Sequence, residues 1–214
     1  MWNKKNCQLS FFNCQLIIAL LSVAFLAGCS DDDNVSVEKP SVQGTFVDAR
    51  DGKEYHYIHV GGLDWSVENL SYDLNDQDLA CVYQNVDDYQ KGDYSTVNAA
   101  KYGMLYSYEG ALQAIPDGWR LPTDADWKAL EASHAYLGED FRLLYGGYFT
   151  KNTAATAYNG SRFMGTWAYF WTATSDTTKD GEFYFARKKF YGTQQMERLS
   201  IEPTAYFLSV RFVR

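Results

Sequence analysis

The chain of 214 residues predicts a mixed α+β fold, with strand patterns on both sides of a central helical region. Side chains that alternate between apolar and polar at every second position are typical of strands. The last strand-like segment, 205–213, shows this alternation, and the other strand-like segments lie at 55–60, 63–70, 163–174 and 182–191. Helical spacing is found at 102–115 and 123–138. We therefore expect an α+β domain with two helices, an antiparallel sheet and long irregular loops.

Composition excludes several classes of protein. With 46% hydrophobic and 21% charged residues, the chain is too apolar for a disordered protein and too evenly mixed for a polytopic membrane protein. Its formal charge of −8 argues against nucleic-acid binding, because contacts to phosphates need clustered positive charge. Four cysteines are too few for a disulfide-dense scaffold.

Residues 1–28 have the organisation of a secretory signal. Lys4 and Lys5 form a basic start, and an apolar run of about twelve residues follows at 16–27. A helix that spans a membrane needs about twenty residues. We therefore expect a cleaved signal peptide here rather than a transmembrane anchor.

The end of this segment, LAGC at 26–29, resembles the lipobox of bacterial lipoproteins. The resemblance implies lipidation (palmitate-type acyl chains) of Cys29 and a membrane partner reached through this anchor. Ser30 and the three aspartates after it resemble the export signal of Bacteroidetes surface lipoproteins, although a solvated charged tail is an alternative. We expect a lipidated flexible tether at 29–43 and a domain exposed on the outer face of the outer membrane.

The domain is expected to span 44–214, and its first half contains a hairpin and a long polar segment. Asp51-Gly52 is typical of a hairpin turn. Residues 71–99 are mostly polar and predict a long loop or insertion. The Asp-x-Asn that begins at Asp73 has Asp78 where a calcium loop needs glycine, so we expect no metal site there.

The two expected helices differ in how well their ends are marked. In 102–115, Leu105, Tyr108, Leu112 and Ile115 are spaced for one face. A turn is expected at 116–118, from the Pro-Asp-Gly sequence there.

The second helix has clear end signals. Thr123 is expected to cap its start, and Asp124 and Asp126 suit the first turn, where the helix dipole favours negative charge. Trp127, Leu130 and His134 are expected on one side. Gly138 is the expected stop.

The last strand is expected to have two different faces. The apolar face carries Tyr206, Leu208, Val210 and Phe212. The other face carries Ser209 and Arg211.

Several motifs in order resemble the Fibrobacter succinogenes major paralogous domain family. The motifs are DGKEY at 51–55, WSVENL at 65–70, YGxLY at 102–106, GWRLPT at 118–123, WTAT at 171–174 and SVR at 209–211. The resemblance covers nearly all of 44–214 and implies a C-type-lectin-like fold. In that fold the terminal strands pair and a long loop presents the ligand surface.

Two groups of proteins with that fold are the formylglycine-generating oxidases and the calcium-dependent lectins, and this chain lacks residues that each group uses. Formylglycine-generating oxidases use a cysteine pair, whereas a mature chain here would keep only Cys29 and Cys81. Calcium-dependent lectins use a Glu-Pro-Asn triplet, where this chain has EPT at 202–204. We therefore expect no catalytic residues, no metal and no cofactor, and Cys81 is expected to be a buried small apolar residue.

Other polar groups have structural explanations. His56 and His59 are three apart on a strand and point to opposite faces, so they cannot share a metal ion. Glu139 and Asp140 are explained by the chemistry of a helix end. Arg120 is expected to pair with a structural carboxylate.

The tyrosines are the main functional signal, because 17 of them exceed the needs of a core. Tyrosine and tryptophan provide rigid contact area at binding surfaces. In the glycine-rich stretch 145–169, which we expect to be a mobile loop, the candidate ligand-binding residues are Tyr148, Tyr158, Arg162 and Trp167. In addition, Thr177 lies in a DTT sequence at 176–178 that resembles the O-glycosylation sequon of Bacteroidetes.

The expected function is therefore a non-catalytic binding or adhesion domain for a glycan or protein ligand, on a surface lipoprotein. One alternative is a structural or accessory subunit of an envelope or fimbrial assembly. Another is a glycan-processing enzyme, which would need a carboxylate pair or metal set in a cleft.

Overall fold

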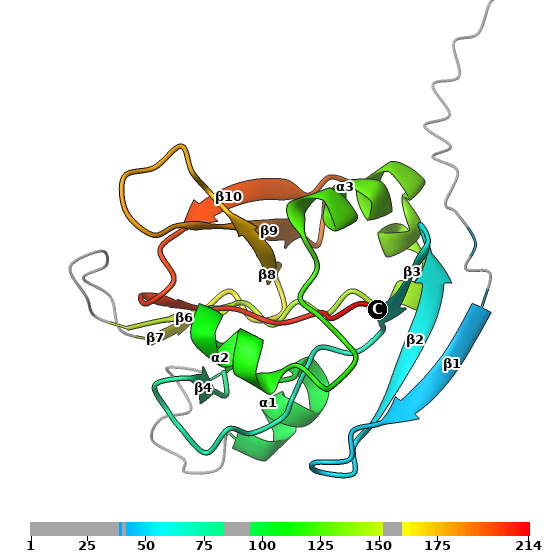
Figure 1. The fold of residues 1–214 in the computed structure, drawn as a ribbon, viewed down its shortest axis with the longest axis horizontal. Helices are drawn as coiled ribbons and strands as arrows, with labels where there is room; N and C mark the ends of the chain where they lie inside the picture. Colours follow the sequence, from blue (N-terminus) through cyan, green and yellow to red (C-terminus); the bar gives the residue numbers. More distant parts are fainter. Residues whose placement is uncertain (1–38, 40–41, 84–94, 152–159) are drawn as a thin grey trace, which may run out of the picture. The chain divides into compact units, whose positions relative to one another are not determined.

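The computed structural model describes residues 39, 42–83, 95–151 and 160–214. All of these residues belong to one compact unit, Val35–Arg214. This unit is mixed: antiparallel sheets dominate and helices are few (Figure 1). No helix in the described residues is long and apolar enough to cross a membrane.

The first sheet contains β1 (Val42–Val47), β2 (Glu54–Val60) and β3 (Leu63–Ser66), antiparallel in the order β1-β2-β3. The expected hairpin turn at 51–52 is confirmed. Gly52 has a φ of 75°, and its N–H donates to the Asp48 carbonyl at 2.8 Å. β3 ends at Ser66, four residues before the expected limit of its strand.

The prediction of a single helix at 102–115 is wrong, and so is the prediction of an uninterrupted loop at 71–99. The structure has β4 (Ala80–Cys81), α1 (Ser95–Tyr102), β5 (Leu105–Tyr106) and α2 (Tyr108–Ala114). Helical structure is interrupted at Gly103, whose φ is 77°. A Cβ atom at this position would lie 2.6 Å from the Leu70 carbonyl oxygen. Three α-helices are therefore described, where two were expected.

The buried face of α2 also differs from the expected one. Leu112 is 52% exposed, whereas Ala111 and Ala114 are fully buried. Tyr106 pairs with Leu208 across a bridge, so this part of the segment is extended.

Helix α3 (Asp124–Ser133) begins where the sequence predicts. The Thr123 side chain accepts from the Asp126 N–H at 3.1 Å, and the Asp126 carboxylate accepts from the Thr123 N–H at 2.7 Å. The expected stop at Gly138 is wrong: His134, with a φ of 57°, ends the helix. Two short 3-10 helices follow, η1 (Ala135–Leu137) and η2 (Glu139–Phe141).

Two further sheets form the C-terminal half. One has the order β10-β9-β8, and the other has the order β11-β6-β7. Their strands are β6 (Tyr148–Thr150), β7 (Gly160–Arg162), β8 (Trp167–Ser175), β9 (Tyr184–Phe190), β10 (Glu197–Ile201) and β11 (Tyr206–Phe207). The expected strands at 163–174 and 182–191 are confirmed, whereas β6, β7 and β10 were not expected.

The C-terminal segment after β11 connects the sheets. The Ser66 N–H donates to the Phe212 carbonyl at 3.0 Å, and Tyr106 and Leu208 exchange two backbone bonds of 2.9 Å. The red trace in Figure 1 accordingly crosses the middle of the domain and ends beside β3. Ser209 and Arg211 are 0% exposed, as are Leu208, Val210 and Phe212, so both faces of this segment are buried.

Large aromatic side chains fill the interior. Trp65 and Trp127 meet edge to face with ring centroids 5.0 Å apart, and both are at most 1% exposed. A second cluster contains Tyr55 and Phe212, 5.4 Å apart and almost perpendicular. Such pairs contribute about 0.5–1.5 kcal/mol beyond the burial of their surface.

Candidate functional site

A cavity of about 500 Å³ is lined by residues of β6, β8, β9, β10 and β11. We call it the tyrosine cavity, because three tyrosines from three strands line it: Tyr148 of β6, Tyr169 of β8 and Tyr206 of β11. The other lining residues are Phe183, Lys188, Leu199, Ser200, Ile201, Glu202 and Leu208.

The three rings form one connected group. The centroids of Tyr148 and Tyr169 are 5.0 Å apart at an interplanar angle of 83°. Tyr148 and Tyr206 are 5.8 Å apart at 57°. Burial raises the pKa of Tyr169, so its hydroxyl stays protonated at neutral pH. Tyr148 and Tyr206 are only half-buried and can contact a ligand.

The charged side chains at the cavity already have partners. The Lys188 Nζ lies 2.9 Å from the Glu197 carboxylate and 4.3 Å from the centroid of the Trp167 ring. The Glu202 carboxylate accepts from the Thr204 hydroxyl at 2.5 Å and from its N–H at 3.0 Å. The cavity therefore offers aromatic faces, hydroxyl groups and fixed charges rather than a free ionic group.

The structure brings three of the four predicted ligand-binding residues to this region. Tyr148 lines the cavity. Trp167 is adjacent to it, because its ring contacts two lining residues: the Lys188 ammonium group, and the Tyr169 ring at a centroid distance of 6.3 Å. Arg162 is exposed and lies opposite Tyr148 in the β6–β7 register, so both side chains lie on the same face of the sheet. Tyr158 lies outside the described residues, as does the predicted lipidation site Cys29.

The expected loop at 145–169 is partly wrong, because β6, β7 and the start of β8 lie within it. The sequence also did not indicate that Tyr206, Lys188 and Phe183 line a site. Their strands come from distant parts of the chain, and only the pairing of β11 with β6 brings Tyr206 close to Tyr148. The excess of tyrosines was the one signal that pointed to such a site.

The predicted modification site at Thr177 lies in the exposed turn between β8 and β9. Asp176 is 4% exposed, and its Oδ1 accepts from the Thr178 N–H at 3.0 Å and from the Thr178 hydroxyl at 2.6 Å. The Thr178 hydroxyl lowers the pKa of Asp176. Thr178 is thus engaged, whereas Thr177 is exposed.

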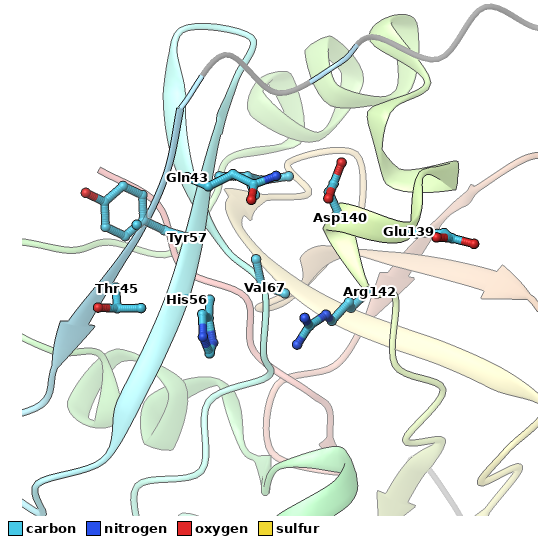
Figure 2. A pocket seen from close by; sticks show the side chains of 10 residues that line it. Gln43, Thr45, His56, Tyr57, Val67, Glu139, Asp140 and Arg142 are labelled. Atoms are coloured by element: carbon cyan, nitrogen blue, oxygen red, sulfur yellow. The ribbon is translucent and has the colours of Figure 1, made fainter.

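A second cavity, of about 470 Å³, lies between the β1–β2 hairpin and the residues around η2 (Figure 2). His56 lines one side, and Asp140 and Arg142 line the other. Val67 lies between them. The sequence explained Glu139 and Asp140 by a helix end, and they lie in η2.

The two strand histidines occupy different places. The His56 Nδ1 is 2.8 Å from the Glu68 carboxylate, and the His59 Nδ1 is 2.8 Å from the Asp64 carboxylate. Within 42–83, 95–151 and 160–214, no three His, Cys, Asp or Glu side chains are grouped so that they could hold a metal ion.

Two further sequence expectations concern Arg120 and Cys81. The Arg120 Nη1 lies 2.6 Å from the Asp126 carboxylate, so the expected pairing is confirmed, with the arginine 47% exposed. Cys81 is a free, partly buried thiol beside Leu105 and Phe207, and burial raises its pKa to about 12.

The fold and these cavities define a mixed, mostly antiparallel domain with an aromatic cavity between strands. Residues 58–142 match the Fibrobacter succinogenes major domain, which supports the expected resemblance to this family over that segment. The match contains three of the expected motifs, at 65–70, 102–106 and 118–123. No curated protein and no solved structure gave a match to the chain.

Proposed function

We propose that this domain binds a ligand without transforming it, and that the ligand is a glycan held in the tyrosine cavity. The observation that carries the proposal is the group of three tyrosine rings around a cavity of about 500 Å³. Ligand pockets of this size combine apolar or aromatic walls with a few fixed polar groups. Sugar rings present both an apolar C–H face and hydroxyl groups, which match the tyrosine rings and their hydroxyls.

The charges at the cavity support binding rather than catalysis. Glycoside hydrolysis needs two carboxyl groups on either side of the scissile bond. Glu202 is the carboxylate among the described lining residues, and Thr204 already occupies it with two hydrogen bonds. A concave cavity also suits a small ligand such as a sugar better than it suits a protein partner, because standard protein interfaces are large and flat.

The chain around this domain extends the proposal. We propose that Cys29 is lipidated, that 29–43 is a tether to the outer membrane, and that the domain faces the cell exterior. A single acyl chain gives marginal membrane binding, whereas two or more anchor a protein stably. In this setting Thr177, in an exposed turn, is the proposed O-glycosylation site.

A C-type-lectin-like fold is the finer structural proposal. Its support is the return of the C-terminal segment to the first sheet, where Asp64 and Arg214 exchange two backbone bonds of 3.0 and 3.1 Å. A crystal structure of the domain that superposes poorly on lectin-like folds would overturn this part alone.

A glycan array with the full-length chain in a non-ionic detergent tests the binding proposal. We expect a defined set of glycans to bind, and we expect Tyr148→Ala and Tyr206→Ala to weaken binding at least tenfold. Tyr191→Ala is the matched control, because Tyr191 is 62% exposed and outside the tyrosine cavity. No glycan bound, or equal loss in all three variants, would contradict the proposal, and binding of a protein instead would favour the protein-ligand alternative.

The anchor and its orientation need separate tests. A clickable fatty acid should label the wild type and should not label Cys29→Ser. Protease added to intact cells should degrade the domain, and protection would place it in the periplasm.

A further inference from the structure

The second cavity contains an arginine with no hydrogen-bond partner for its guanidinium among the described residues. We call this cavity the Arg142 cavity. The Arg142 side chain is 63% exposed, and the nearest carboxylate oxygen, Oε1 of Glu68, is 3.8 Å from its Nη1. Glu68 is already engaged, because it accepts from the His56 N–H at 2.8 Å and contacts the His56 ring at 2.8 Å. In Figure 2 the guanidinium points across the cavity towards His56.

The backbone of Arg142 is held in an unfavourable conformation. Its φ of 45° and ψ of 62° lie in the left-handed region, which side chains other than glycine and asparagine rarely adopt. The buried Arg211 fixes this geometry, since its Nη2 donates to the Arg142 carbonyl at 2.6 Å and its Nη1 to the Phe141 carbonyl at 3.3 Å. Strained residues that the surrounding structure holds in place are concentrated at ligand sites.

The same cavity carries an opposite charge with no partner. Asp140 is exposed, and its carboxylate has no hydrogen bond or ion pair with any described residue. In the view of Figure 2, Val67 separates it from the His56 ring. Val67 and Ile58 also line the cavity, although they are only 3% and 2% exposed. The cavity thus has separate places for an anionic group and for a cationic group.

We propose that the Arg142 cavity is a second binding site, for a small zwitterionic ligand that carries an ammonium group and a carboxylate or phosphate. The anionic group is bound by the Arg142 guanidinium, whose planar fork can donate two parallel hydrogen bonds to it. The ammonium group is bound by the Asp140 carboxylate. Amino acids and peptides are one source of this chemistry, and the phosphoethanolamine head group is another.

Isothermal titration calorimetry on the full-length chain in a non-ionic detergent tests this proposal. The probes are glycylglycine and O-phosphoethanolamine, with N-acetylglycine and glycinamide as compounds that keep only one of the two charges. We expect at least one zwitterion to bind, and both single-charge compounds to bind at least tenfold more weakly. Tighter binding of glycylglycine indicates a peptide or amino-acid ligand, and tighter binding of O-phosphoethanolamine indicates the head group.

Variants identify the site. Arg142→Gln and Asp140→Asn should each weaken the zwitterion at least tenfold, whereas Arg142→Lys should retain part of the affinity. The matched controls are Lys179→Gln and Asp180→Asn, because both residues are exposed in the turn between β8 and β9. The proposal is overturned if neither zwitterion binds, if one charge alone binds equally well, or if the controls weaken binding as much as the site variants. Tyr206→Ala should leave this binding unchanged, which separates the result from the tyrosine cavity.

Discussion

Arg211 is a buried cation that has no carboxylate partner among the described residues. Its guanidinium donates to the Asn69 side chain at 2.8 Å and to the backbone carbonyls of Ser66, Val67, Phe141 and Arg142. Burial lowers its pKa to about 9, so it remains charged at neutral pH. The Arg211 side chain thereby joins the end of β3 to the turn that contains Arg142.

Replacing Arg211 should therefore be severely destabilising. We expect Arg211→Met to lower the free energy of unfolding by about 3–5 kcal/mol, because several buried carbonyl groups lose their donor. Urea unfolding at pH 7 measures this. Arg198→Met is the matched control, since Arg198 is 45% exposed and its ion pair with Asp124 should contribute no more than about 1 kcal/mol. Equal effects of the two changes would contradict the role assigned to Arg211.

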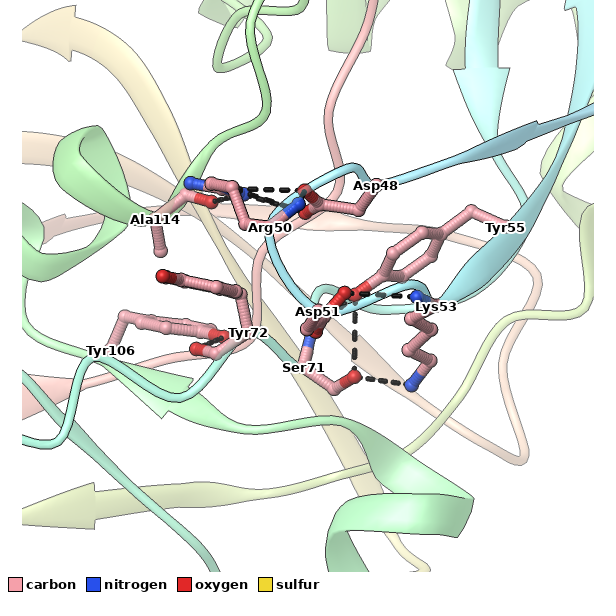
Figure 3. A network of polar contacts seen from close by, with 9 residues as sticks. All are labelled: Asp48, Arg50, Asp51, Lys53, Tyr55, Ser71, Tyr72, Tyr106 and Ala114. Atoms are coloured by element: carbon pink, nitrogen blue, oxygen red, sulfur yellow. Dashed lines mark hydrogen bonds and ion pairs between the residues drawn. The ribbon is translucent and has the colours of Figure 1, made fainter.

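Asp48 makes stability depend on pH. Its carboxylate, 2% exposed, accepts from the Arg50 Nε at 2.9 Å and from the Arg50 Nη2 at 2.7 Å (Figure 3). The Arg50 hydrogen bonds lower the pKa of Asp48 below its usual value of 3.8. The folded state thus binds this proton less readily than the unfolded state, so the pair stabilises the fold above about pH 4 and loses this effect as the pH falls through the lowered pKa.

Asp48→Asn tests this dependence. At pH 7 it should lower the free energy of unfolding by about 1–3 kcal/mol, since a charge-assisted hydrogen-bond pair is lost. The difference between wild type and variant should shrink between pH 4 and pH 2, as measured by urea unfolding at several pH values. A difference that stays constant over this range would mean that ionisation of Asp48 is not the cause.

At the scale of elements, local sequence motifs predicted where helix α3 begins better than they predicted where it ends. Thr123 caps α3 as expected, and Asp126, which was expected only in the first turn, completes a capping box with it because the two residues are three positions apart. The break at Gly103 could not be inferred from helical spacing, because it depends on the carbonyl of Leu70 more than thirty residues earlier. In the same way Leu112 has the spacing of a core residue, yet α2 turns Ala111 and Ala114 inwards.

Helix α2 allows a test in which helix propensity and packing have opposite effects. Gly110→Ala should stabilise an isolated helix by about 1 kcal/mol. In this fold the new Cβ would lie 2.0 Å from the Leu79 carbonyl oxygen, which is backbone and cannot move aside freely. We expect a loss of about 2 kcal/mol or more, measured as a lower midpoint in urea.

Leu112→Ala is the control on the same helix. Because Leu112 is 52% exposed, it should change stability by less than about 1 kcal/mol. A large loss for Leu112→Ala, together with a neutral Gly110→Ala, would support the helix face expected from the sequence and contradict the packing described.

At the scale of the whole molecule, the sequence predicted a strand at 205–213 but not its partners. The alternation of Leu208, Val210 and Phe212 marks an extended segment, whereas its backbone hydrogen-bond partners lie between 38 and 150 residues away. The same limitation applies to the tyrosine cavity, because an aromatic excess in the composition does not tell which strands bring the rings together. Local chemistry thus specifies elements, and long-range pairing specifies the site.

The central place of the C-terminal segment predicts the order in which the fold opens. Its backbone is bonded to distant partners, as in the Leu208 N–H bond to Tyr106 at 2.9 Å and the Val213 N–H bond to Arg120 at 2.9 Å. β1, by contrast, has β2 as its one neighbour in the sheet order. Amides that exchange only by global unfolding belong to the most connected elements, and less connected edges open at lower free energy. Hydrogen–deuterium exchange on the full-length chain, followed by peptide mass spectrometry, should therefore show the slowest exchange for 206–214 and faster exchange for 42–47. If 206–214 exchanged as fast as β1, the C-terminal segment would open without unfolding the rest of the domain, which would contradict its role as the element that joins the sheets.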